Sequence, residues 1–270
     1  MRRLNLNFTL RDNCLLYISI VKFIVQIKNQ KYTVDRSKPL DISIPLKASG
    51  NNLGAWNLGK PTIEPVKMDD WVGSVKKGAS VNFNNISFNP HAHGTHTECV
   101  GHISEEFYSV NKSLRQFFYL SEVISVTPQK TGNDMVILAS EVERLLEGKQ
   151  PEALVIRTLP NTSDKKTMQY SNTNWPYLEK AAAEYIRDLG VSHLLIDLPS
   201  VDKEKDDGKL FAHRAFWNFP DATRFEATIT EFIYVPNHID DGSYLLDLQI
   251  APFENDATPS KPILYKFLEL

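Results

Sequence analysis

The chemistry of this 270-residue sequence is concentrated between positions 91 and 102. Four of the seven histidines lie there, His91, His93, His96 and His102, and Glu98 stands among them. In an extended segment, residues two apart project to the same side, so His96 and Glu98 can converge on one point. Imidazole nitrogen and carboxylate oxygen together suit zinc, manganese or iron. We therefore expect a metal site here rather than a loop of solvated histidines.

The pattern Gly94-Thr95-His96-x-Glu98-x-x-x-His102 resembles the signature of the cyclase family of metal-dependent hydrolases. Members of that family include bacterial kynurenine formamidases and isatin hydrolases. The resemblance extends over roughly residues 32–270, through a strand-like segment at 41–46 and the sequence Asp-Leu-Pro-Ser-Val-Asp at 197–202. It implies a bound divalent metal, zinc first and manganese second, with one or two ions in the site.

This chain departs from the family pattern at three positions. Ala92 stands where the family has its first histidine, and a shift of one residue would bring His91 or His93 to that place. We expect His91 to be the ligand and keep His93 as the alternative. Glu98 replaces an aspartate, which keeps the charge and adds one methylene, and Val100 replaces a proline.

The resemblance also implies a later histidine and a later glutamate in the metal site. His213 matches the histidine, and Glu226 and Glu231 are the candidates for the glutamate. The family spacing favours Glu226. The alternation of residues 224–235, however, places Glu231 alone on an apolar face. A buried carboxylate without a cation costs several kcal/mol, so we expect Glu231 to be a metal ligand.

By the same resemblance, His102 corresponds to the residue that transfers a proton in the family. A neutral imidazole titrates at about pH 6.5 and can take a proton from water and return it to a leaving nitrogen. The alternative is that His102 is a further metal ligand. Trp56 and Trp217 are predicted to contact an aromatic substrate, with ordinary packing as the alternative.

Three polar residues outside the cluster have two interpretations each. Asp197 and Asp202 could orient a histidine ligand, or they could be turn residues at the end of a strand. Arg157 could bind a substrate carboxylate or form a structural ion pair. His193 and His238 receive no role in the site.

Hydrophobic patterning predicts the elements that must position these side chains. A hairpin is expected at 24–34, strands at 40–46, 153–159 and 191–198, a long exposed loop at 48–60, and helices at 135–146 and 174–189. The order strand, helix, strand favours a parallel α/β unit, and the patterns of 224–235 and 244–252 favour antiparallel sheet. We expect a single-domain α/β fold with a mixed sheet, of the swivelling β/β/α type that the resemblance implies.

Composition narrows the class of protein. The chain is 42% hydrophobic and carries 30 basic and 33 acidic residues, for a formal net charge of -3. This balance argues against a protein that binds nucleic acid or an acidic membrane. Cys14 and Cys99 are too few and too far apart for a disulfide framework, which favours a cytoplasmic location.

The first residues resemble a short signal peptide, but Arg11, Asp12 and Lys22 interrupt the pattern and no cleavage site follows. The apolar run is also shorter than the ~20 residues that span a bilayer. We expect residues 1–23 to be an extension, disordered or not native, before a hydrolase domain at 24–270.

The functional hypothesis is a cytoplasmic amidohydrolase that cleaves N-formylkynurenine to kynurenine and formate, an arylformamidase of tryptophan catabolism. One alternative is hydrolysis of another linear or cyclic amide, such as an isatin-like lactam. Another is a metal-binding homologue without catalysis. The resemblance further implies a homodimer or larger homo-oligomer whose partner is a small-molecule amide.

Overall fold

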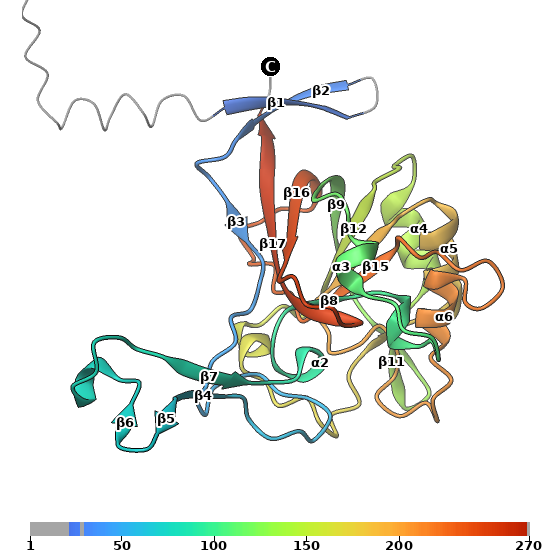
Figure 1. Cartoon of the computed structure of the whole chain (residues 1–270). Coiled ribbons are helices and arrows are strands. Elements are labelled where there is room, and N and C mark those ends of the chain that lie inside the picture. The colour runs from blue at the N-terminus through green and yellow to red at the C-terminus, as the bar shows by residue number, and fades with distance from the viewer. Residues whose placement is uncertain (1–21, 28–29, 269–270) are drawn as a thin grey trace, which may run out of the picture.

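The centre of the molecule is a mixed sheet that closes on itself (Figure 1). The computed structural model describes residues 22–27 and 30–268. Seven strands form the ring in the order β17-β16-β9-β12-β14-β15-β8, and β8 pairs again with β17. Their bounds are β8 His96–Glu98, β9 Phe118–Val126, β12 Ala153–Thr158, β14 His193–Ile196, β15 Thr228–Glu231, β16 Gly242–Ile250 and β17 Ala257–Leu268. The strands from β9 to β15 run parallel and the other pairings in the ring are antiparallel.

The parallel strands are buried on both faces, which explains their uninterrupted apolar sequences. In β12, Ala153 and Val155 pack in the cluster inside the ring, and Leu154 and Ile156 pack in the cluster under the helices. Three helices cover that outer side (Figure 1): α4 Ala139–Leu146, α5 Lys180–Asp188 and α6 Phe211–Trp217. The predicted α/β fold with a mixed sheet is confirmed, whereas the swivelling β/β/α description stays a prediction.

Both predicted helices begin later than expected. Residues 134–137 form β11 (Asp134–Ile137) before α4, and residues 177–178 form β13 (Tyr177–Leu178) before α5. These strands pair with each other, and β10 (Gln129–Thr131) adds a third strand to the small sheet. Two or three apolar residues fit a short strand as well as the first turn of a helix, so the spacing alone could not separate the two.

The hairpin at the N-terminal side is confirmed as β1 (Lys22–Ile27) and β2 (Gln30–Asp35). The predicted extension at 1–23 lies outside the described residues except for its last two positions, which belong to β1. The strand expected at 40–46 is shorter and consists of β3 (Leu40–Asp41) and an isolated bridge from Ser43 to Ile233. No helix within the described part of the chain is long and apolar enough to cross a membrane.

The strand expected at 224–235 is restricted to β15, because Phe232 adopts a positive φ of 55° and ends it. The antiparallel prediction for this segment is right for its pairing with β8 and wrong for its pairing with β14, which is parallel. The segment at 244–252 matches β16, which is antiparallel to both neighbours.

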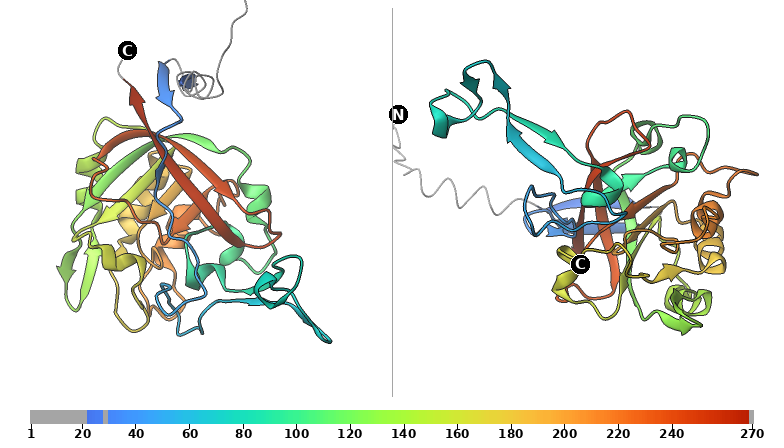
Figure 2. Two further views of the ribbon diagram at one scale, coloured as in Figure 1. Left: turned by 90° about the vertical axis from the view of Figure 1, so that its left-hand side faces the viewer. Right: turned by 90° about the horizontal axis from the view of Figure 1, so that it is seen from below.

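An arm of antiparallel strands projects from the barrel (Figure 2). It contains β4 Thr62–Pro65, β5 Lys67–Met68, β6 Trp71–Val72, the short 3-10 helix η1 Val75–Lys77 and β7 Asn84–Ser87. The loop before it, at 48–60, is irregular as expected. It is not exposed throughout, because Leu53 and Ala55 are buried against Tyr170, Trp175 and Phe232. The remaining short helices are α2 Pro90–His93, η2 Val100–His102, α3 Val110–Ser113 and η3 Ser163–Lys166.

His193, at the start of β14, is buried, and among the described residues its imidazole forms no ion pair with a carboxylate. Its ring lies on that of Tyr119, with centroids 4.0 Å apart, and its Nδ1 shares a hydrogen bond of 2.8 Å with Thr228 Oγ1. Burial lowers the pKa of His193 to about 3. The imidazole is therefore neutral in the folded protein at neutral pH.

Because His193 is buried in its neutral form, we expect the free energy of unfolding to fall in acid. Because the pKa in the folded state is below the unfolded value of about 6.5, unfolding takes up a proton as the pH falls through this window, at up to ~1.4 kcal/mol per pH unit. His193→Asn should lessen the fall in unfolding free energy between pH 7 and pH 4.5, measured by urea denaturation, whereas the exposed His238→Asn should not. An unchanged pH dependence in His193→Asn would contradict this prediction.

Candidate metal centre

The centre is built on β8, which lies between β15 and β17. His96 and Glu98 share one face of this strand, and Thr97 on the other face hydrogen-bonds to Thr230 at 2.7 Å. The register places Glu231 directly opposite His96, and side chains in such a pair are neighbours. The structure thus places Glu231, the glutamate that the strand phase favoured, beside His96.

The competing glutamate lies elsewhere. Glu226 is exposed in the segment before β15. Glu231 is buried, its Oε2 lies 3.4 Å from His96 Nε2, and its Oε1 accepts a hydrogen bond from the backbone N–H of Val201. The structure thus brings Glu231, and not Glu226, to the histidines.

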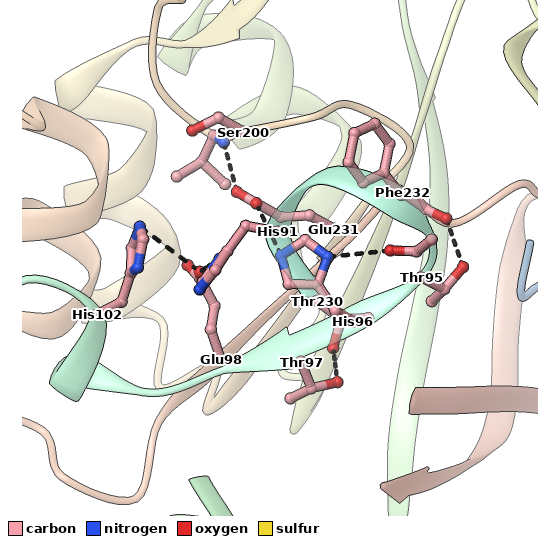
Figure 3. A network of polar contacts seen from close by, with 12 residues as sticks. His91, Thr95, His96, Thr97, Glu98, His102, Ser200, Thr230, Glu231 and Phe232 are labelled. Atoms are coloured by element: carbon pink, nitrogen blue, oxygen red, sulfur yellow. Dashed lines mark hydrogen bonds and ion pairs between the residues drawn. The ribbon is translucent and has the colours of Figure 1, made fainter. Parts of the chain in front are cut away.

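Glu98 is the hub of the cluster (Figure 3). It is completely buried, and its Oε1 accepts a hydrogen bond from His213 Nε2 at 3.0 Å. Its Oε2 lies 3.1 Å from His91 Nδ1 and 3.8 Å from His102 Nε2. Burial alone would raise the pKa of Glu98, but the imidazoles of His102, His213 and His91 hold it well below its usual range.

Two histidine rings are oriented by hydrogen-bond acceptors on the side of the ring that faces away from the glutamates. His96 Nδ1 donates to the carbonyl oxygen of Gly94 at 3.1 Å, and His213 Nδ1 donates to Asp202 Oδ2 at 2.6 Å. Asp202 in turn accepts from the backbone N–H of His213. Each ring is thereby left with its Nε2 directed at a glutamate. Of the two interpretations of Asp202, orientation of a histidine is the one that its contacts support.

The other two histidines share one acceptor. Asp256 Oδ2 lies 3.0 Å from His91 Nε2 and 3.3 Å from His102 Nδ1. Burial would lower the pKa of His91, but the neighbouring carboxylates of Asp256 and Glu98 raise it to about 10. The same two imidazoles lower the pKa of Asp256.

These residues fit a divalent metal. His96 Nε2 and Glu98 Oε2 are buried and have no hydrogen-bond partner among the described residues. Three groups of side chains have ligand atoms within 4.8 Å of one another: His91, His96 and Glu98; Glu98, His102 and His213; and His91, His102 and Asp256. Glu98 belongs to two of these groups, and mixed imidazole and carboxylate donors of this kind would suit zinc or manganese.

Local backbone geometry sets this arrangement. The helical turn α2 brings His91 toward Glu98, and Gly94, which follows it, is fully extended. The turn α2 therefore brings His91 to the cluster, and Gly94 continues from it as extended backbone. At Gly101 a side chain is excluded, because a Cβ there would lie 2.3 Å from the carbonyl oxygen of Tyr108. This close approach packs η2 and places His102 beside the cluster.

Three residues from the sequence analysis lie outside the centre. His93 Nδ1 accepts a hydrogen bond from the backbone N–H of Asn89, and His93 belongs to none of these three groups. Asp197 forms an ion pair with Lys165 at 2.8 Å and does not touch a histidine. Arg157 pairs with Asp241 at 2.7 Å and donates to carbonyl oxygens, which is the structural alternative.

The two tryptophans have different environments. Trp217 is completely buried, donates from Nε1 to the carbonyl oxygen of Ala227, and packs against His213 with ring centroids 5.4 Å apart. Its contacts match the packing alternative, because no part of the ring reaches the surface. Trp56 is 37% exposed and donates from Nε1 to the carbonyl oxygen of His91 at 3.1 Å. It therefore lies beside the centre.

Sequence reasoning missed Asp256. It lies in the connection between β16 and β17, in a polar run that is typical of any turn. The pairing of β17 with β8, which places Ala257 opposite Glu98, brings it to the histidines. A long-range pairing of this kind leaves no local signal.

The fold and the site define an α/β barrel with a candidate metal centre on one of its strands, and comparison with known proteins gives its family. The Cyclase family model matches residues 40–203, more than half of the chain, and the chain belongs to this family. Curated relatives include the kynurenine formamidases of Bacillus anthracis, 26% identical, and Bacillus thuringiensis strain Al Hakam, 27% identical. Each match extends over 231 residues and covers 84% of this chain and 97% of the relative.

Solved structures share the fold at lower identity. A predicted metal-dependent hydrolase from Bacillus stearothermophilus is 16% identical with a TM-score of 0.59, covering 84% of this chain and 98% of the other. An isatin hydrolase bound to the product analogue thioisatinate is 13% identical with a TM-score of 0.59, covering 85% and 93%. At these identities the likeness shows a common fold.

The structure predicts that His91, and not His93, contributes to metal affinity. His91→Ala should lower the affinity for zinc on the order of 100-fold, because zinc sites draw about 10–16 kcal/mol from four ligands. His93→Ala should leave zinc affinity unchanged. Titration of both metal-free variants with zinc measures the difference, and a loss in His93→Ala with none in His91→Ala would reverse the assignment.

Proposed function

We propose that this protein is a metal-dependent amidohydrolase. The observation that carries the proposal is the buried carboxylate of Glu98, which faces imidazole nitrogens of His91, His102 and His213. A structural ion pair needs one cationic partner, whereas an array of imidazoles around a buried carboxylate is an arrangement suited to a metal. Membership of the Cyclase family supports the same conclusion.

We assign the metal to His91, His96, Glu98, His213 and Glu231. Such a donor set suits zinc first and manganese second, in one or two ions. When bound, the metal would polarise a carbonyl group and make water more acidic. The protein's own contribution is to hold the ligand atoms in place, through Asp202 behind His213 and the carbonyl oxygen of Gly94 behind His96.

His102 is assigned as the proton carrier. Its side chain is 31% exposed, against 19% for His91 and 2% or less for His96 and His213, so it lies at the solvent side of the cluster. Its Nε2 faces Glu98 and its Nδ1 is held by Asp256. In this position His102 would take a proton from water and return it to the leaving nitrogen of the amide.

The proposed substrate is N-formylkynurenine, cleaved to kynurenine and formate. The support is the name of the curated relatives, kynurenine formamidase, together with the half-exposed ring of Trp56 beside His91. A cyclic amide of the isatin type is the second candidate, because isatin hydrolases share the fold. We further propose that the enzyme is a homodimer or larger homo-oligomer and that it acts in the cytoplasm.

An assay of two substrate classes tests this function. The zinc-loaded protein should hydrolyse N-formyl-anilides with a higher kcat/KM than isatin-type lactams. His102→Ala should retain zinc but lose about 10²–10⁴-fold in kcat, because proton transfer by a positioned side chain contributes that much. His238→Ala, which removes an exposed histidine elsewhere, is the control.

Two outcomes would change the conclusion. Faster cleavage of lactams would favour the second substrate. A fully zinc-loaded protein that cleaves neither class would favour a metal-binding homologue without catalysis.

A further inference from the structure

We propose that Asp256 is a positioning residue that sets the tautomers of both His91 and His102. One carboxylate thereby determines which nitrogen each ring presents to the centre. The inference rests on the proposed metal site but concerns a residue outside the family signature. It ties a proposed ligand to the proposed proton carrier.

The geometry comes from a single oxygen atom. Asp256 Oδ2 lies 3.0 Å from His91 Nε2 and 3.3 Å from His102 Nδ1. The two rings stack, with centroids 4.2 Å apart and an angle of 27° between their planes. An ionised carboxylate only accepts hydrogen bonds, so each ring must carry a proton on the nitrogen that faces Asp256.

In the metal-loaded protein, the other nitrogen of each ring would be free of its proton and able to bind the metal or to accept a hydrogen bond. His91 presents Nδ1 to Glu98 Oε2 at 3.1 Å, and His102 presents Nε2 to the same oxygen at 3.8 Å. The two neighbours thus use different ring atoms. Without an acceptor behind them, neutral imidazoles would divide between two tautomers, and the wrong one would direct an N–H at the centre.

His91 directs Nδ1 toward Glu98 because of its place on the backbone. His91 lies on the short turn α2, next to the completely buried Ala92. Its ring also lies edge-on to that of His96, with centroids 5.0 Å apart. The ring approaches Glu98 with the nitrogen nearer to the backbone, and its far nitrogen, Nε2, needs a partner of its own. Asp256 supplies that partner.

Asp256 is itself held firmly to the strand that carries Glu98. Its carbonyl oxygen accepts a hydrogen bond from the backbone N–H of Cys99 at 3.0 Å, and the next residue, Ala257, pairs with Glu98 in the sheet. The carbonyl oxygen of Asn255 accepts from the N–H of Val110 at 2.9 Å. The connection between β16 and β17 is therefore anchored on both sides of the carboxylate.

In the described part of the chain, the ion pairs of Asp256 are with His91 and His102 and with no lysine or arginine. A carboxylate whose purpose was only to stabilise the loop would gain as much from a surface lysine, as Glu254 does from Lys112. The contacts of Asp256 are instead directed at the centre.

Nitrogen NMR of zinc-loaded protein with ¹⁵N-labelled histidine tests the inference, together with zinc titration of the metal-free form. The wild-type spectrum should show His91 protonated at Nε2 and His102 at Nδ1. Asp256→Asn should give His102 a mixture of tautomers and lower zinc affinity about 10–100-fold, the usual cost of losing a partner behind a ligand. Glu254→Gln, two residues earlier and exposed, should change neither.

Two results would overturn the inference. The inference is overturned if Asp256→Asn keeps the wild-type nitrogen signals and zinc affinity, even with a lower melting temperature. It is also overturned if the wild-type spectrum shows the reverse tautomers, a result that requires no variant to fold. A protein that binds zinc but cleaves no amide would refute the proposed function and leave this inference standing.

Discussion

The completely buried carboxylate of Glu98 is the constraint on which the rest of the structure depends. A carboxylate away from water costs several kcal/mol unless positive charge or hydrogen-bond donors surround it. Imidazoles from the turn α2, the 3-10 turn η2 and helix α6 surround Glu98, and the imidazole of His96 on strand β8 pairs with the second buried carboxylate, Glu231. Each of these elements is positioned so that a histidine nitrogen lies close to Glu98 or to Glu231.

Closure of the barrel brings these carboxylates and imidazoles together. The short strand β8 fills the gap between β15 and β17, and its register fixes His96 opposite Glu231. Glu231 ends β15 next to the segment that follows β14, where Asp202 holds His213 from behind. Polar side chains at the carboxyl ends of parallel strands are the common location of binding sites in α/β folds. The sheet carries His96, Glu98 and Glu231, the elements α2, η2 and α6 carry the other histidines of the cluster, and polar partners orient their rings.

The alternation of residues, and not the family spacing, favoured the glutamate that the structure places beside His96. The alternation of β15 placed Glu231 on a buried face, and the antiparallel register then put it against His96, whereas Glu226 lies outside the strand. His91 was favoured because it flanks Ala92, where the family has its first histidine, and the structure places it 3.1 Å from Glu98. The period of two in a strand is a local property, so it survives without knowledge of the fold.

The features that the sequence did not predict depend on contacts between distant parts of the chain. Asp256 joins the histidines through the pairing of β17 with β8, more than 150 residues apart in sequence, and its own surroundings are ordinary turn residues. The aromatic ring of Trp217 suggested a substrate contact, but burial against His213 depends on how α6 packs on the sheet. The late starts of α4 and α5 likewise reflect pairing between β11 and β13 that a single segment cannot reveal.

X-ray diffraction from crystals of the zinc-loaded protein, measured at the zinc absorption edge, is the most direct test of the central claim. The structure predicts an anomalous peak at bonding distance, about 2.0–2.2 Å, from a carboxylate oxygen of Glu98, with histidine nitrogens completing the coordination. Zinc bound elsewhere on the protein, with Glu98 paired only to protonated histidines, would contradict it.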